Sequence, residues 1–440
     1  MGEVEEVESC YVAPSEETPR QPLWLSPLDV LLANRGHTPT VYLYQRDAAA
    51  AVAGGGFFEV GRLKKAMAKA LVAFYPLAGR LRRCAGGGRP EIDCNAEGAL
   101  FVVARSSELT VDAFSDLKPS PELRRLFVPR IEPASIVLGV QHLQVTFLSC
   151  GGVALGTVLH HSAIDALSAF HFFLTWSSYC RYGDAAAVDL PCHERTLLRA
   201  RSPPVVHPDA HAMFSLKLNL RDEPTRPVST KIFDISEGQL AALRQTCGGT
   251  STFCAVSALV WQCACVARRL PLSAETRLTF PVNIRRRVRP PLPDRYFGNA
   301  LVVVSAASTV EDVVSGTLAA TAALVRATLR RADDEMLRSA IDHGEMMVGG
   351  RSTWNPPAAR GNLPDTELRV TSWLGMPVYD ADFGWGKPLV MSRAESVRGG
   401  FVYVMDGAGG DASGGGVRVL MCMEAVKMEE FKRLIYARFG

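Results

Sequence analysis

The sequence predicts an α/β protein built from two domains of mixed sheet and helices. Strand-like and helix-like segments alternate in both halves of the chain. The 440 residues exceed the roughly 100–200 of a typical single domain. Between the halves, residues 189–228 are rich in proline and charge and lack sustained periodicity, which is typical of a linker. We therefore expect a first domain at 1–188, a crossover linker at 189–228 and a second domain at 229–440.

The first half is expected to contain a strand at 41–44, a helix at 60–74, two strands at 137–148 and 153–160, and a helix at 166–180. Leu63, Met67 and Leu71 recur at helical spacing and support the first helix. Gly151 and Gly152 separate the two strands and predict a hairpin turn. A strand should therefore end just before residue 161, with a helix soon after.

The second half repeats this mixed pattern. We expect helices at 235–246, 252–268 and 310–331, and strands at 277–282, 300–304, 369–373, 401–405 and 417–423. Residues 406–416 hold six glycines between the last two strands. They lack the strand, G-x-G-x-x-G, helix order of a dinucleotide site, so they predict a hairpin loop.

Composition argues against several classes of protein. The 48 basic and 45 acidic residues leave a net charge of +3, unlike a nucleic-acid-binding protein. No apolar run reaches the roughly 18 residues of a membrane span, and the acidic start does not resemble a signal peptide. The 11 scattered cysteines suit a reducing compartment. We therefore expect a cytoplasmic protein without nucleic-acid or membrane partners.

The strongest chemical signal is an H-x-x-x-D motif, from His161 to Asp165, where an apolar strand meets a helix. Histidine takes and returns protons near neutrality because its ordinary pKa is about 6.5. Asp165 can fix the imidazole tautomer or hold the turn through its own hydrogen bonds. A structural reading, with a capping aspartate and two partly buried histidines, is equally compatible with this motif alone. A metal site of His160 or His161 with Asp165 and His171 is disfavoured because the spacing offers no convincing third ligand.

A second signal is the sequence Asp382-Phe-Gly-Trp-Gly386. Its two glycines bracket Trp385 and let the backbone pass close to a bulky neighbour. The alternative is a tight bend around a core aromatic side chain.

A third signal is the group of five arginines in residues 283–299, set around three prolines. Guanidinium groups match phosphate bidentately, so such a loop can bind a phosphorylated ligand. A solvated basic loop is the more common explanation of such a pattern.

Together, in this order, the motifs at 161–165 and 382–386 resemble the signatures of the plant BAHD family of coenzyme A-dependent acyltransferases. The resemblance spans nearly the whole chain. Within the family it is greatest to the hydroxycinnamoyl-CoA shikimate/quinate transferases, through residues 17–20, 23–26, 37–39, 74–81, 91–95 and 296–299. It implies two domains of chloramphenicol acetyltransferase-like fold with an active-site channel between them.

The same resemblance implies a mechanism. His161 would act as general base on a hydroxyl or amine acceptor, which attacks the thioester without a covalent acyl-enzyme. Asp165 would have a structural, orienting role, with Arg285 as its expected partner. Trp385 and the hydroxyl of Thr371 are the candidate donors to the oxyanion.

The resemblance also implies binding residues. His37, Tyr42 and Trp373 would line the substrate pocket, and Arg285 and Arg287 are candidate ligands of coenzyme A. An acyl-CoA thioester would enter as a co-substrate, and no separate cofactor or metal is expected. The expected state is a monomer.

Three departures from the family pattern stand out. Ala166 replaces the glycine that usually follows the motif aspartate, so the turn there must tolerate a Cβ atom. Asn283 and Ile284 replace an aspartate and a glycine before the arginines. Pro364 stands where shikimate transferases carry an arginine that binds the acceptor carboxylate.

This third departure bears on the acceptor. Asp365 and Glu367 lie near Pro364, whereas Arg360 and Arg369 are out of register. A carboxylate in the acceptor pocket would make a cationic amine plausible. Alternatively, the loop carries Arg360 inward.

The sequence therefore predicts a hydroxycinnamoyl-CoA transferase with a shikimate- or quinate-like acceptor. An amine or another alcohol is the alternative acceptor. A non-catalytic acyl-CoA-binding member is a further alternative, which His161 argues against. The last alternative is a hydrolase, but the chain lacks a recognisable nucleophile motif.

Overall fold

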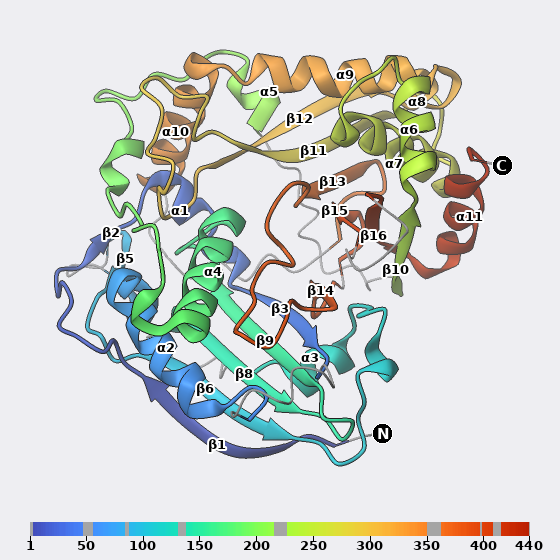
Figure 1. Ribbon diagram of the computed structural model, residues 1–440. Helices are drawn as coiled ribbons and strands as arrows, with labels where there is room; N and C mark the ends of the chain where they lie inside the picture. The colour runs from blue at the N-terminus through green and yellow to red at the C-terminus, as the bar shows by residue number, and fades with distance from the viewer. Residues whose placement is uncertain are drawn as a thin grey trace.

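Two six-stranded mixed sheets form the framework of the computed structural model (Figure 1). The structure describes residues 3–46, 56–83, 88–130, 138–214, 227–349, 362–396, 398–407 and 415–439. The first sheet has the order β1 (Glu5–Val12), β6 (Ala99–Arg105), β8 (Gln141–Phe147), β9 (Val153–His160), β3 (His37–Tyr44) and β14 (Val390–Arg393). Strands β6 and β8 are parallel, and the other neighbours are antiparallel.

The second sheet has the order β10 (Val228–Ile235), β16 (Val417–Glu424), β15 (Phe401–Asp406), β13 (Glu367–Ser372), β11 (Glu275–Asn283) and β12 (Leu301–Thr309). Strand β13 runs parallel to both β11 and β15. A small sheet consists of β2 (Leu23–Trp24), β5 (Pro90–Asp93), β4 (Arg80–Arg83) and β7 (Leu138–Gly139). The α/β class and the two mixed sheets agree with the sequence.

The helices divide between the two halves of the chain. They are α1 (Pro27–Leu31), α2 (Val60–Ala73), α3 (Pro121–Phe127), α4 (Ala166–Tyr182), α5 (Ala210–Phe214), α6 (Glu237–Thr246), α7 (Thr252–Arg268), α8 (Val310–Ser315), α9 (Leu318–Arg331), α10 (Asp334–Gly349) and α11 (Ala425–Tyr436). None of the helices within the described ranges is long and apolar enough to cross a membrane.

Helices cover both faces of the first sheet. Helices α2 and α4 lie side by side on one face, where the Trp176 indole N–H donates to the Leu63 carbonyl at 3.0 Å. Helix α3 packs on the other face, where the Gln144 side-chain amide donates to the Leu126 carbonyl at 2.8 Å. Strand β9 is buried along its whole length between these layers. Its end, and the motif that follows, are therefore fixed by the core.

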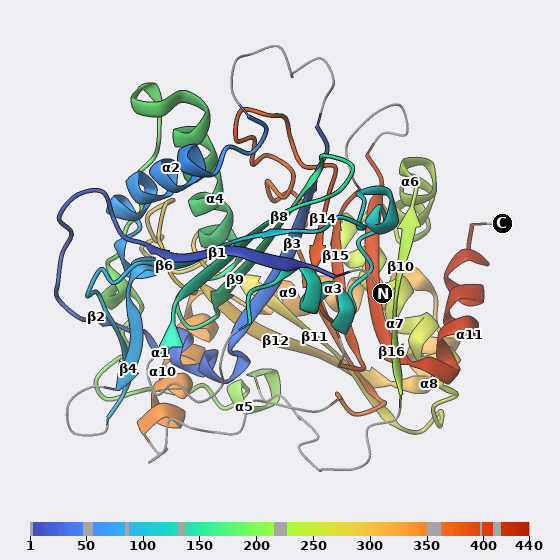
Figure 2. The same cartoon turned by 90° about the horizontal axis from the view of Figure 1, so that it is seen from below.

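The two halves are more interwoven than the sequence suggests. Strand β14, from the range expected to form the second domain, completes the first sheet by pairing with β3. It lies between β3 and β15 in the views of Figures 1 and 2. The expected linker also packs into the protein, since Arg195 and Leu198 are each only 1% exposed. Contacts cross both expected boundaries, at 188 and at 228. The division of the chain into domains at these residues remains a prediction.

One expected helix is divided. Residues 310–331 form α8 and α9 rather than a single helix. The hydroxyl of Thr317 accepts from the Ala320 N–H at 3.2 Å and so begins a new helix after Gly316. A side-chain cap of this kind competes with continuation of the first helix.

Gly156 on β9 gives a direct test of the packing of this strand. A Cβ atom there would lie 1.7 Å from the backbone oxygen of Phe127. We predict that Gly156→Ala lowers the free energy of unfolding by about 1–3 kcal/mol or more, because backbone must shift. Urea unfolding followed by tryptophan fluorescence measures this loss.

The matched control is Gly238→Ala in α6, where an added Cβ meets nothing within 4 Å. That variant should be as stable as the parent or slightly more stable. Equal effects of the two substitutions would contradict the close approach of α3 to β9.

Candidate active site

The backbone of His161 is held from both halves of the chain. The residue follows β9 directly, and its N–H donates to the Gly36 carbonyl at 2.9 Å. Its carbonyl accepts from the Asn299 side chain at 2.7 Å. Asn299 precedes β12 of the second sheet. The position of His161 therefore depends on how the two halves meet.

Asp165 is buried and caps α4. Its Oδ1 accepts from the Ser168 N–H at 3.0 Å, and its Oδ2 accepts from the Ala300 N–H at 3.1 Å. Arg285 completes the site with a bidentate ion pair of 2.7 and 3.0 Å. The expected pairing of Asp165 with Arg285 is thus present.

The protonation of Asp165 follows from these contacts. Burial by itself raises the pKa of this carboxyl, but the Arg285 guanidinium and the two backbone donors outweigh it and hold the pKa below its ordinary value. The carboxylate is therefore ionised near neutrality. Both its oxygens are occupied, so Asp165 orients the turn and does not set the tautomer of His161 by direct contact.

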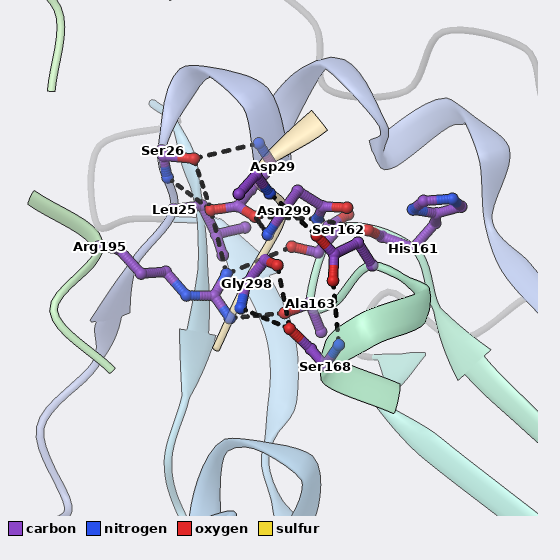
Figure 3. Close-up of polar contacts among 12 residues, drawn as sticks. Leu25, Ser26, Asp29, His161, Ser162, Ala163, Ser168, Arg195, Gly298 and Asn299 are labelled. Carbon is purple, nitrogen blue, oxygen red and sulfur yellow. Dashed lines mark hydrogen bonds and ion pairs between the residues drawn. The ribbon is translucent and has the colours of Figure 1, made fainter. Parts of the chain in front are cut away.

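A second buried ion pair clamps the same turn. Asp29 accepts from the backbone and side-chain N–H groups of Asn299, each at 2.9 Å. Arg195 pairs with Asp29 at 3.1 Å and donates to the carbonyls of Ser162 and Ala163 at 3.4 and 2.5 Å. Figure 3 shows these groups converging while the His161 imidazole points away from them. The network fixes the backbone and leaves the ring outside it.

Sequence reasoning did not identify Asp29 and Arg195. The signal for Asp29 was the pattern Ser26-x-x-Asp29, which forms a capping box at the start of α1. Arg195 lies in the segment 189–228, which the sequence predicts to be a linker, and no motif marks it there.

The imidazole of His161 is neutral near pH 7. Burial and the nearby Arg35 lower its pKa to about 4, with a smaller contribution from Arg393, although Asp165 acts in the opposite direction. Its Nδ1 has no hydrogen-bond partner within the described part of the chain. The His161 backbone itself also acts to raise this pKa, but the net effect keeps the ring neutral. A neutral imidazole on a fixed backbone is able to accept a proton.

Other candidate residues lie around this turn. His37 stands opposite His160 in the β3–β9 register, and its Nε2 is 2.9 Å from the Gly139 carbonyl. Tyr42 is buried and packs against Phe173 of α4 with ring centroids 5.8 Å apart. Their roles in lining an acceptor pocket remain predictions.

Thr371 belongs to the second sheet, and Trp373 follows the same strand directly. Trp373 packs edge-on against Phe170, in the second turn of α4, and also contacts Tyr403. Thr371 is half-buried near the end of β13. The roles of Thr371 as an oxyanion donor and of Trp373 in substrate binding remain predictions.

The structure places Trp385 near the end of α4 that lies farther from His161, and its expected oxyanion role remains an untested prediction. Its indole stacks on Phe58 and lies 4.8 Å beneath the guanidinium of Arg62, which donates to the Cys180 carbonyl at the end of α4. His161 lies before the start of the same helix. Because α4 has 17 residues, it is about 25 Å long. Trp385 therefore supports the far end of the helix, consistent with the alternative of a tight bend around an aromatic side chain.

Two details of the motifs agree with expectation. Gly384 and Gly386 have positive φ angles of 99° and 100°, and a Cβ at Gly384 would meet Arg62 at 2.8 Å. Ala166 is the first residue of α4, a helical position that accepts a Cβ atom.

The arginines of residues 283–299 do not form one free cluster. Arg285 is 5% exposed and is occupied by Asp165, which speaks against its expected contact with coenzyme A. Arg287 donates to the carbonyls of Leu329 and Ala332 at the end of α9. A contact of Arg287 with coenzyme A remains a prediction.

The metal alternative does not fit this geometry. Both oxygens of Asp165 are engaged, and His171 Nε2 is 2.8 Å from the Asp189 carbonyl. Within the described ranges, no three His, Cys, Asp or Glu side chains are grouped to hold a metal ion.

The Asp165–Arg285 pair makes a measurable contribution to stability. We predict that Asp165→Asn lowers the free energy of unfolding by about 3–5 kcal/mol, because it leaves a buried guanidinium without its counter-ion. The control is Asp294→Asn, which breaks an exposed ion pair with Arg286 and should change stability by less than about 1 kcal/mol. Urea unfolding of both variants measures the two free energies of unfolding. Similar small losses for the two variants would contradict the role of the Asp165–Arg285 pair in stability.

Comparison with known proteins supports the resemblance of the motifs. A family model described as the Transferase family matches residues 2–437. Putrescine hydroxycinnamoyltransferase 1 of Oryza sativa is 44% identical, over 98% of each chain. The hydroxycinnamoyl-CoA:5-hydroxyanthranilate N-hydroxycinnamoyltransferase of Avena sativa is 39% identical, over 97% of this chain and 98% of that protein. The shikimate O-hydroxycinnamoyltransferase of Nicotiana tabacum is 35% identical, over 98% and 99%.

Solved structures share the architecture. Vinorine synthase matches with a TM-score of 0.73 and 25% identity, over 97% of this chain and 96% of that chain. TRI101 of F. graminearum, in complex with coenzyme A and deoxynivalenol, matches with a TM-score of 0.75 and 19% identity, over 94% and 97%, which indicates a common fold. The chain therefore belongs to the Transferase family, the BAHD acyltransferases, and is an acyltransferase.

Proposed function

We propose that this enzyme transfers a hydroxycinnamoyl group from its coenzyme A thioester to the hydroxyl or amine of a small acceptor. The observation that carries the proposal is the His161 imidazole, which is neutral and sits on a backbone fixed from both halves. In this mechanism the ring accepts the acceptor's proton as its oxygen or nitrogen attacks the thioester carbonyl. The tetrahedral intermediate then expels the thiolate of coenzyme A, which takes the proton from His161.

No covalent acyl-enzyme and no bound cofactor take part in this scheme. The acyl-CoA is a co-substrate, and Thr371 remains the candidate donor to the oxyanion. Transfer rather than hydrolysis requires that water be kept from the thioester.

Two classes of acceptor are supported. A shikimate- or quinate-like alcohol is the class predicted from sequence, and a tobacco relative is named for shikimate. An amine is the second class, because the rice and oat relatives named for putrescine and 5-hydroxyanthranilate have the higher identities of 44% and 39%.

The first experiment measures acceptor-dependent thiol release from p-coumaroyl-CoA. The panel is shikimate, quinate, 5-hydroxyanthranilate and putrescine, with mass spectrometry of each product. We predict a new ester or amide with at least one acceptor.

We predict that His161→Ala lowers kcat by about 10²- to 10⁴-fold because the general base is lost. His207→Ala, a histidine in the segment before α5, is the control; near-normal turnover by folded His161→Ala would contradict the mechanism.

The acidity of His161 sets the pH dependence of the reaction. The neutral ring is the active form, and its pKa is lowered to about 4. With an alcohol acceptor such as shikimate, whose hydroxyl does not titrate in this range, we therefore predict that kcat/KM stays level from neutrality to about pH 5 and falls only below it. Initial rates in buffers of constant ionic strength test this, with reassay at neutral pH to detect denaturation. A reversible limb centred near the ordinary histidine pKa of about 6.5 would contradict it.

A further inference from the structure

Arg195 is a buried cation in the segment that the sequence predicts to be a linker. Its side chain is only 1% exposed. Shortly before it, the Cys192 N–H donates to the Arg295 carbonyl at 2.8 Å. Shortly after it, the Arg201 guanidinium pairs with Asp342 of α10 at 2.6 Å. The segment is therefore attached to the second half of the chain on both sides of Arg195.

The guanidinium of Arg195 reaches from this segment to the turn behind the base. It pairs with Asp29 at 3.1 Å and donates to the carbonyls of Ser162 and Ala163 at 3.4 and 2.5 Å. Ser162 directly follows His161, and both carbonyls belong to the turn between β9 and α4. The position of this turn therefore depends on a side chain that comes from outside both sheets.

A second route leads from Arg195 to His161 through Asp29. The Asp29 carboxylate accepts from the Asn299 side-chain amide at 2.9 Å, and the same amide donates to the His161 carbonyl at 2.7 Å. Asp29 is fully buried, so its charge is tolerated only with a counter-ion. Arg195 supplies that counter-ion and thereby also supports the contact on the His161 carbonyl.

The position suits a planar guanidinium. Such a group presents several N–H donors in fixed directions, so it binds a carboxylate and two carbonyls at once. Gly298 leaves room for it, since an added Cβ there would lie 3.3 Å from the Cζ and Nε atoms of Arg195. Lysine would carry the same charge as a compact group without this fork. The contacts to the turn therefore depend on arginine and not on positive charge alone.

We propose that Arg195 is a positioning residue for acyl transfer, which holds the turn behind His161 and so fixes the imidazole for proton transfer. This inference rests on the proposed function. Arg195 acts through the backbone, because Figure 3 shows the imidazole pointing away from it. A displacement of about 1 Å in a reacting group can lower a rate by about 10²-fold. A segment expected to be only a linker therefore contributes to catalysis.

The competing explanation is that the Asp29–Arg195 pair only stabilises the fold. In that case, every variant that folds fully would keep the parental kcat. Substitutions that preserve the fold but remove the contacts to the turn distinguish the two explanations.

Two variants avoid leaving a buried charge unpaired. The double variant Asp29→Asn/Arg195→Met removes both charges together, and its asparagine keeps an oxygen that can accept from Asn299. Arg195→Lys keeps the ion pair but loses the planar fork. The control is Arg199→Met, because Arg199 is an exposed residue of the same segment that stacks on Trp24 at 5.1 Å. Thermal melts establish that each variant folds, and the Tm of the double variant should be near that of the parent.

Kinetics are measured with p-coumaroyl-CoA and the acceptor that the parent uses fastest. We expect kcat of the double variant and of Arg195→Lys to fall by about 10- to 100-fold, because the base is displaced. The KM of both substrates should stay near the parental values, since the loss concerns the transition state. The Arg199→Met control should keep the parental kcat.

Hydrogen exchange of the full chain without substrate gives a readout that does not depend on activity. The N–H groups of His161 and Ala163 donate to the carbonyls of Gly36 and His160, each at 2.9 Å. In the double variant and in Arg195→Lys, these two amides should exchange about tenfold faster or more, because the turn has lost charge-assisted hydrogen bonds. Amides in the middle of α4 should exchange as in the parent.

Three results would overturn the inference. They are a parental kcat in the folded double variant, a loss confined to the KM of one substrate, and a fall in kcat without faster exchange at the two amides. Faster exchange in the variants, with a parent protein that transfers no acyl group, would instead support the hold of Arg195 on the turn and contradict the proposed function.

Discussion

The buried ion pair between Asp165 and Arg285 is the constraint on which the site depends. Asp165 caps α4 in the first half, and Arg285 follows β11 in the second. Because burial raises the free energy of either charge alone, the pair is stable only when the two halves meet in this register. The same contact aligns Asn299 with the carbonyl of His161. The position of the His161–Asp165 motif, at the end of β9, therefore depends on how the two halves of the chain meet.

Two buried ion pairs hold the backbone beside His161. Asp29 is matched by Arg195, and Asp165 is matched by Arg285. Because each carboxylate has its own guanidinium, the turn that carries His161 is held by the protein itself, without a ligand.

Local pattern was sufficient to predict much of the fold. Helical spacing predicted α2, α4 and α7, and the strand ending before His161 was expected from its apolar run. These elements are long and lie within continuous segments, so periodicity identifies them. The break between α8 and α9 was missed because it depends on one capping side chain, Thr317.

The candidate site was only partly predictable. His161 and Asp165 lie within one short motif, and resemblance identified Arg285. The surroundings of Trp385, beside Phe58 and Arg62, could not be read from its motif, because they depend on how that segment packs against α2 and α4. Asp29 and Arg195 come from segments far apart in sequence, so their pairing depends on the tertiary structure.

A double-mutant cycle on Asp165 and Arg285 tests the central constraint most directly. The free energy of unfolding is measured for the parent, Asp165→Asn, Arg285→Gln and the double variant. If the pair joins the halves as described, the second substitution adds little to the first, with a coupling energy of about 2 kcal/mol or more. Losses that add to within about 0.5 kcal/mol would show that the two residues act independently and would contradict the account.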